Sequence, residues 1–247
     1  MDVGRIAHVC LAIIFSCLPA VLPAASESAD SHAAIKQALA RSYPDIKILD
    51  VSRSTLPGLY EVFTGDSIAY TDGSGEHLLV GRLLDVRTKK DLTAERLDER
   101  NAIDFRSLPF DKAIKIVKGN GRRELAVFSD PDCPYCQKLE RELASMTDVT
   151  VHIFLFPLTG VHPQAMAHAR SIWCAPDRAQ AWTQWMLKRT EPPARACEGE
   201  PTAELQALGQ KLRIPGTPTM YLTNGRRIAK DLPKEELQRL LASSSAR

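Results

Sequence analysis

The chain has 247 residues, of which 44% are hydrophobic, 25% are charged and 6% are aromatic. This composition is typical of a globular protein and excludes collagen-like, low-complexity and fully disordered chains. The 32 basic and 30 acidic residues leave a formal net charge of +2, so the charge balance indicates neither a nucleic acid nor an acidic partner.

Residues 1–25 have the pattern of a secretory signal peptide. Arg5 supplies a positive charge, residues 9–18 form an apolar run, and small residues suited to cleavage follow. The run is shorter than the roughly 20 residues that a membrane-spanning helix needs. A lipoprotein signal cut before Cys17 is an alternative, which the bulky Phe15 disfavours. Export places the mature chain in an oxidising compartment.

Residues 26–88 predict a small domain in which one helix is followed by strands and turns. The helix is expected over residues 31–43 and ends at Pro44. Strands are expected over residues 46–48, 59–63 and 68–70, and a longer apolar strand pair over residues 77–86. A unit of this size buries little core alone, which favours help from a second copy of the chain.

Residues 89–104 are charged and helix-prone, and they predict a linker helix to a second domain over residues 105–247. That domain is expected to contain, in chain order, a strand, a helix, a strand, several helices, a hairpin and a final helix. Its clearest strand covers residues 124–128. Asn224-Gly225 predicts a two-residue hairpin turn.

Export makes the cysteine count informative. Cys10 and Cys17 fall within the signal peptide, and four cysteines remain in the mature chain: Cys133, Cys136, Cys174 and Cys197. An even number in an exported chain indicates two disulfides, although the sequence permits three pairings. Closeness in sequence favours one pair within the C-x-x-C motif, Cys133 with Cys136, and a second pair between Cys174 and Cys197.

The C-x-x-C motif follows a predicted strand and opens a predicted helix. Cys133 directly precedes that helix, whose free N–H groups and dipole stabilise an anion, and Pro134 suits the first helical position. Such a place can lower a thiol pKa from about 8.5 to roughly 3.5–7.5. Cys136, one turn later, can attack a mixed disulfide formed on Cys133. The pair therefore predicts thiol–disulfide exchange.

Two other interpretations of the motif remain open. A C-x-x-C is also half of a zinc site, which Cys174 and Cys197 could complete, although a second close C-x-x-C is missing and export disfavours zinc thiolates. An inert disulfide between Cys133 and Cys136 is the third possibility. Cys174 and Cys197 have no anion-stabilising context, so they are expected to form a structural disulfide that closes a loop of about 24 residues.

The remaining polar candidates are weaker. Asp130 lies three residues before Cys133, where it could tune the thiol, take up protons or cap the helix. Four histidines show no metal-ligand spacing, and no role is predicted for them: His77, His152, His162 and His168. Glycine-rich nucleotide motifs are missing, so nucleotide binding is not expected. No metal and no cofactor is expected.

Four segments in this order resemble the periplasmic DsbC/DsbG disulfide isomerase family: LYEVFTGDSIAYTDGSGEHLLVGRLLDV (59–86), FSDPDCPYCQKLE (128–140), SIWCAPDRAQAW (171–182) and GTPTMYLTNG (216–225). The resemblance covers essentially the whole mature chain. It implies a mixed α+β and α/β protein with a cystatin-like dimerisation domain over 26–88, a linker helix over 89–104, and a thioredoxin-fold domain with a helical insertion over 105–247.

The resemblance also implies site residues by position. Cys133 is the expected nucleophile and Cys136 the resolving thiol. The substrate-binding residues are expected to be Pro134, Tyr135, Thr217 and Pro218. A cis Thr217–Pro218 bond facing the cysteines would let the Thr217 backbone pair with a substrate strand. The structural disulfide is expected between Cys174 and Cys197.

The implied assembly is a V-shaped periplasmic homodimer whose cleft holds misfolded exported proteins with wrong disulfides. The membrane reductase DsbD is the implied electron donor, and no nucleic acid is expected. Pro134-Tyr135 is similar to DsbG, whereas the short linker is similar to DsbC. Both disulfide isomerisation and reduction of oxidised single cysteines therefore stay open as activities.

Two other functions are weighed against the isomerase. A dithiol oxidase would donate disulfides, but a dimer cleft would shield Cys133 from the partner that reoxidises it. A holdase would bind unfolded chains with incidental cysteines. Val127 stands where thioredoxin buries an acid, so the proton of the resolving thiol must go to another group or to water.

Overall fold

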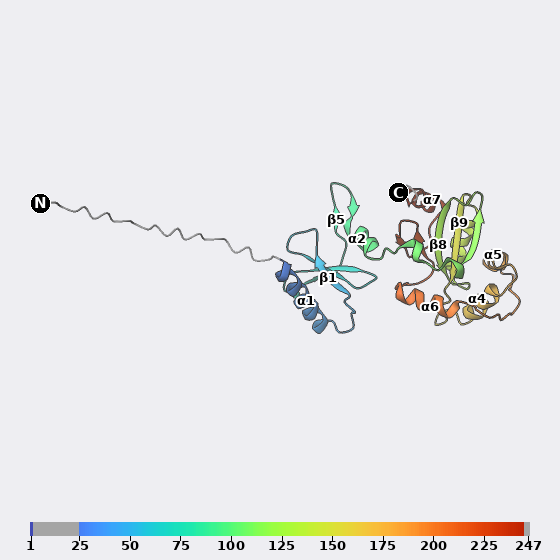
Figure 1. Cartoon of the computed structure of the whole chain (residues 1–247), viewed down its shortest axis with the longest axis horizontal. Helices are drawn as coiled ribbons and strands as arrows, with labels where there is room; N and C mark the ends of the chain where they lie inside the picture. Colours follow the sequence, from blue (N-terminus) through green and yellow to red (C-terminus); the bar gives the residue numbers. More distant parts are fainter. Residues whose placement is uncertain (2–24, 245–247) are drawn as a thin grey trace.

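The computed structural model describes residue 1 and residues 25–244, with side chains from residue 31 onward in the second range. Residues 2–24 of the predicted signal peptide, including Cys17 of the alternative lipoprotein signal, lie outside the described residues. Within residues 25–244, no helix is both long and apolar enough to cross a membrane. Figure 1 shows two lobes joined by a narrow segment of chain, drawn in green.

The N-terminal lobe is a helix packed on a small antiparallel sheet. Its main elements are α1 (Ala25–Ser42), β1 (Asp50–Arg53), β2 (Tyr60–Phe63), β3 (Ile68–Thr71) and β4 (Leu78–Leu79), with the strands in the order β1-β2-β3-β4. Ile35 and Leu39 lie one turn apart on α1, so they share a face and are buried against Val51 and Val62 of the sheet. This core is small, as the sequence predicts.

The expected long strand pair over residues 77–86 is wrong. Only β4 pairs with β3, whereas β5 (Leu84–Asp85) pairs with β6 (Lys90–Asp91) in a separate two-stranded sheet. Where the chain leaves the first sheet, Arg82 binds Asp91, and Asp91 also accepts a hydrogen bond from the Ala94 N–H at the start of the next helix. Val80, at the departure point, is 82% exposed.

The predicted linker contains helix α2 (Leu92–Arg100). The helix packs onto the first lobe, because the Thr93 hydroxyl hydrogen-bonds the Tyr70 hydroxyl at 2.5 Å and Leu97 packs against the cluster around Tyr70. After α2, the Ile103 N–H donates to the Gly225 carbonyl at 3.1 Å in the second lobe. The linker is thus attached at both of its ends.

The second lobe is built on a five-stranded sheet in the order β11-β10-β8-β9-β7. The strands are β7 (Ile114–Lys118), β8 (Arg123–Ser129), β9 (Val149–Leu155), β10 (Thr219–Leu222) and β11 (Arg227–Ile228). Strands β8 and β9 are parallel, and the other pairs are antiparallel. Phe128 and Phe154 stack with ring centroids 5.0 Å apart in the core. Every residue of β9 is buried, as expected for a strand covered on both faces.

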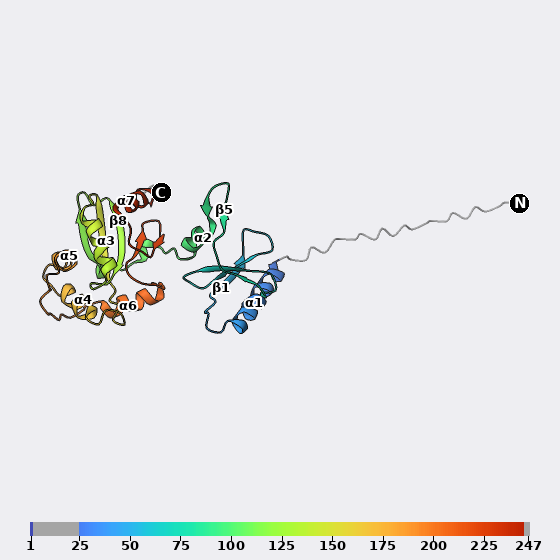
Figure 2. The same ribbon diagram turned by 180° about the vertical axis from the view of Figure 1, so that it is seen from behind.

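Helices and short turns complete this lobe. They are the 3₁₀ turns η1 (Phe105–Ser107) and η2 (Phe110–Lys112), and the helices α3 (Pro134–Ala144), α4 (Ala165–Trp173), α5 (Arg178–Lys188), α6 (Thr202–Lys211) and α7 (Lys234–Ser244). Figure 2 shows α3 running along β8 across one face of the sheet. Helices α4 to α6 form the insertion between β9 and β10. The insertion is tied to α3, because the buried Trp182 indole donates to Glu140 at 3.1 Å.

The predicted hairpin is present, but its loop is longer than two residues, because the Leu222 N–H donates to the Arg226 carbonyl at 3.1 Å and encloses residues 223–225. Strands β10 and β11 pair, and the Gly225 N–H donates to the Leu222 carbonyl at 2.9 Å. Gly225 has φ +84°, whereas Asn224 is not among the residues with positive φ. A two-residue I′ turn needs positive φ at both positions, so the observed form is a turn followed by a left-handed glycine.

Candidate active site

Cys133 lies where β8 passes into α3. It is the N-cap residue of α3, and Pro134 takes the first helical position with its preset φ. Cys133 and Cys136 are both buried and are free thiols, joined neither to each other nor to another cysteine of residues 25–244. The strand therefore delivers the sulfur of Cys133 to the N–H groups that begin the helix.

The two thiols differ sharply in acidity. The pKa of Cys133 is lowered to about 5, first by the hydrogen bond from the Cys136 thiol and then by N–H groups at the start of α3, which outweigh the opposing effect of burial. Burial first, and then the neighbouring Cys133 sulfur, raises the pKa of Cys136. At neutral pH Cys133 therefore carries a negative charge while Cys136 keeps its proton.

The Thr217–Pro218 loop lies against the first cysteine. The bond between these residues is cis, and the Cys133 sulfur is 3.3 Å from the Thr217 carbonyl oxygen, to which a protonated thiol donates. The Thr217 hydroxyl is buried without a hydrogen-bond partner among the described residues, and Thr217 is among the groups that lower the pKa of Cys133. Pro134 and Tyr135 are exposed beside the sulfur, and 63% of Tyr135 is accessible. The predicted substrate-binding residues thus surround Cys133.

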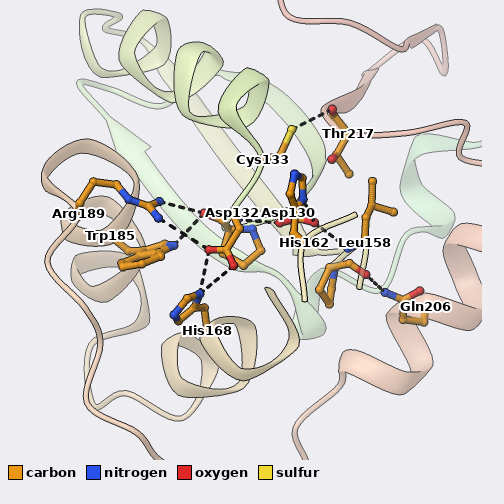
Figure 3. A network of polar contacts seen from close by, with 12 residues as sticks. Asp130, Asp132, Cys133, Leu158, His162, His168, Trp185, Arg189, Gln206 and Thr217 are labelled. Atoms are coloured by element: carbon orange, nitrogen blue, oxygen red, sulfur yellow. Dashed lines mark hydrogen bonds and ion pairs between the residues drawn. The ribbon is translucent and has the colours of Figure 1, made fainter. Parts of the chain in front are cut away.

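Asp130 does not cap α3, so that expectation is wrong. Its carboxylate is fully buried and accepts hydrogen bonds from the N–H of Asp132 at 2.7 Å, the N–H of Leu158 at 2.6 Å and the ring of His162 at 2.9 Å (Figure 3). The helix N-cap, Cys133, makes no side-chain capping bond, which leaves the helix N-terminus open to the thiolate. Asp130 instead fastens the loop before Cys133 to the segment after β9.

The helical insertion holds the same loop from the other side, partly through His168, for which the sequence predicted no role. His168 on α4 binds Asp132 at 2.8 Å, and the Trp185 indole on α5 donates to the Pro131 carbonyl at 2.8 Å. Figure 3 shows these side chains converging on the loop. His162 is 32 residues from Asp130, so no local spacing could have indicated the pair.

Cys174 and Cys197 form a disulfide with a Cα–Cα distance of 5.5 Å and a sequence separation of 23. It joins the end of α4 to the segment before α6. Their sulfurs are therefore not available to a zinc ion shared with Cys133 and Cys136. Val127, where thioredoxin carries an acid, is buried in the core.

Replacing Cys174 and Cys197 together by alanine is expected to lower the free energy of unfolding by about 3 kcal/mol, because the unfolded chain regains the entropy of the open loop. Urea denaturation measures the loss, with Cys133 and Cys136 kept as free thiols in both proteins. The rate of Cys133 alkylation serves as the control and should stay unchanged. A loss below about 1 kcal/mol would contradict a structural role for this bridge.

The acidity of Cys133 predicts the pH profile of its alkylation. Because the thiolate is the reactive form and the pKa is about 5, the rate should rise through a midpoint near pH 5 and then stay level to about pH 8. An ordinary thiol would continue to rise towards its pKa of about 8.5. Iodoacetamide labelling resolved by mass measures this profile, and a midpoint above about pH 7 would contradict it.

A thiol pair at a helix N-terminus after a central strand, facing a cis-proline loop, defines a dithiol oxidoreductase of the thioredoxin fold. Residues 110–244 match the model of the thioredoxin-like domain family, and residues 24–94 match that of the disulfide bond isomerase protein N-terminal domain. The fold class expected from the sequence is confirmed.

Comparison with known proteins identifies the family within this class. The chain is 38% identical to a probable thiol:disulfide interchange protein DsbC of Bordetella pertussis, over 83% of this chain and 72% of that protein. It is 40% identical to the Bordetella avium counterpart, over 84% and 74%. A crystal structure of a disulfide interchange protein from Neisseria gonorrhoeae shares 45% identity with a TM-score of 0.55, covering 57% of this chain and all of that one. The chain belongs to the DsbC family and is a thiol:disulfide oxidoreductase/isomerase.

Proposed function

We propose that the protein is a periplasmic disulfide isomerase and reductase in which Cys133 attacks wrong disulfides of exported proteins. The observation that carries this proposal is the difference in acidity and position between the two thiols. Cys133 has a pKa of about 5 and lies at the open N-terminus of α3, whereas Cys136 is buried with a raised pKa. Breaking a wrong disulfide requires such a resting thiolate.

The exchange begins when the Cys133 thiolate attacks one sulfur of a substrate disulfide. A new bond joins the two sulfurs, the old bond breaks, and the second substrate sulfur leaves as a thiolate. In isomerisation, another substrate thiolate attacks the mixed disulfide and Cys133 leaves unchanged, so no net oxidation occurs. Substrate backbone pairs with the Thr217–Pro218 loop, while Pro134 and Tyr135 provide apolar contact.

Reduction is the second outcome of the same intermediate. The Cys136 thiol loses its proton to water, attacks the Cys133 sulfur, and releases the substrate as a dithiol. The substrate gains two electrons and the protein keeps the Cys133–Cys136 disulfide. A dithiol donor must then reduce that disulfide, and the membrane reductase DsbD is the proposed donor.

Thiol trapping in the native compartment tests this function. Proteins are quenched with acid, alkylated and counted by mass. We expect Cys133 and Cys136 to be free and Cys174 and Cys197 to be bridged. Four bridged cysteines would instead support a dithiol oxidase and overturn the isomerase proposal. Rates with a scrambled protein and with a sulfenic acid substrate then separate isomerisation from reduction of single oxidised cysteines.

We further propose a homodimer formed through the N-terminal lobe. Strand β4 is the edge of its sheet and exposes Leu79 by 56%, next to Val80 at 82%. An apolar hollow of about 610 Å³ opens beside it, lined in part by Leu78 and Val80. The unpaired backbone groups of an edge strand can pair with a strand of another chain, and the same edge of a second copy would cover the exposed apolar side chains.

Val80→Asp is expected to convert the dimer into a monomer, because it would bury an unpaired charge at the edge. Val117→Asp is the matched control, since Val117 is also an exposed valine at a sheet edge, on β7 of the second lobe, whereas Val80 directly follows β4. Sedimentation velocity measures both variants. The proposal fails if the parent chain is monomeric or if Val80→Asp remains dimeric. The monomer should also lose isomerisation of large scrambled substrates while its alkylation rate is kept.

A further inference from the structure

Asp130 is a buried acidic residue close to the reactive thiol. The side chain is fully buried, and a carboxylate in that position needs compensating charge. Two backbone N–H groups bind it, from Asp132 and Leu158. Among the residues that the structure describes, His162 is the one side chain that forms an ion pair with it, at 2.9 Å. The counter-charge of Asp130 therefore comes from His162.

The orientation of the His162 ring is set by its own backbone. The His162 N–H donates to the Leu158 carbonyl at 2.8 Å, while the Leu158 N–H binds the same Asp130 carboxylate oxygen as the ring. The ring uses Nδ1 for Asp130, and its side chain is 20% exposed. Figure 3 shows the ring between Asp130 and the Cys133 side chain.

We propose that His162, held as an imidazolium by Asp130, is a positioning residue that stabilises the Cys133 thiolate through its charge. The positive charge favours Cys133 as a thiolate before attack. It equally favours Cys133 as a leaving group, because the thiolate is recovered when a substrate sulfur breaks the mixed disulfide. The proposal rests on Cys133 being the attacking thiol, as proposed above.

The charges around the ring support this assignment. Asp130, Cys133 and Asp132 act on His162 and raise its pKa, with the hydrogen bond to Asp130 as the largest cause. Asp132 itself contacts His168 at 2.8 Å and the Arg189 guanidinium at 3.9 Å. Of the three anions, only Cys133 gains and loses its charge during exchange. The effect of His162 on catalysis therefore falls on Cys133.

His162→Gln tests the proposal, since it keeps a hydrogen-bonding side chain and removes the charge. The thiolate absorbance of Cys133 in the full-length protein is followed against pH. We expect the midpoint to rise by about one pH unit, which leaves about tenfold less thiolate below the midpoint. His77→Gln is the matched control, because His77 also binds an aspartate through Nδ1, at 2.5 Å from Asp72, but in the N-terminal lobe. That control should keep the parent midpoint.

A second measurement needs no substitution and so does not depend on the variant folding. Nuclear magnetic resonance titration of the His162 imidazole is compared between the reduced protein and the protein with a Cys133–Cys136 disulfide. By linkage, loss of the thiolate should lower the pH at which His162 titrates.

Unchanged His162 titration on oxidation, or an unchanged Cys133 midpoint in a folded His162→Gln protein, would overturn the role of His162. The proposed function would survive that result if the parent midpoint stays near pH 5. A parent midpoint above about pH 7 would instead contradict the proposed function itself.

Discussion

Cys133→Ser is expected to abolish the refolding of scrambled disulfide-bonded proteins, with a loss of more than about 100-fold that reaches the uncatalysed rate. A serine hydroxyl is not ionised at neutral pH, so no nucleophile remains at the N-terminus of α3. Refolding of a scrambled ribonuclease, followed by recovery of its activity, measures the loss. Unchanged refolding would favour a holdase in which the cysteines are incidental.

Cys136→Ser is the matched variant, because it removes the second sulfur and keeps the first. Attack by Cys133 should continue, but the mixed disulfide can no longer be resolved from within the site. Covalent complexes with substrate should therefore accumulate and be visible on non-reducing gels. If neither variant changed the refolding rate, the proposed roles of Cys133 as nucleophile and Cys136 as resolving thiol would be wrong.

Gly225→Ala is expected to destabilise the second lobe by about 3 kcal/mol or more. Gly225 has φ +84°, and an added Cβ would lie 2.1 Å from the Ile103 carbonyl oxygen, which is backbone of the linker. The hairpin loop would have to move away and would strain the hydrogen bond from the Ile103 N–H to the Gly225 carbonyl. Urea denaturation with a probe in the tryptophan-containing lobe measures the change.

Gly199→Ala separates contact from backbone strain. Gly199 lies in the same lobe at φ +70°, but nothing stands within 4 Å of an added Cβ. It should therefore show only the cost of a left-handed alanine, about 1 kcal/mol. Equal losses in the two variants would mean that the Ile103 contact has no energetic weight.

Much of the architecture follows from local patterns in the sequence. Ile35 and Leu39 mark the buried face of α1 through their helical spacing, and Pro44 marks its end. The central strand β8 and the start of α3 are equally legible, because an apolar run is followed by Cys133-Pro134. These features depend on neighbours within one or two turns, and such neighbours are visible in a linear sequence.

The errors arose where the pairing partners lie outside the local pattern. Residues 77–86 have the composition of a strand pair, yet Leu84 and Asp85 pair with Lys90 and Asp91 in a separate two-stranded sheet, beside the ion pair between Arg82 and Asp91. Asp130 stands near a helix start, but its carboxylate is taken by His162 and by the Leu158 N–H. His162 lies 32 residues from Asp130, so no local spacing indicates that contact.

The reactive motif and its likeness to known disulfide isomerases could be read from residue order alone, because a thiol at a helix start has its chemistry set by the next few residues. The surroundings of that thiol could not. The Thr217 carbonyl is 84 residues away from Cys133, and the loop before it is held by α4 and α5. Only folding brings these groups together, since burial and charge act through space and are indifferent to position along the chain.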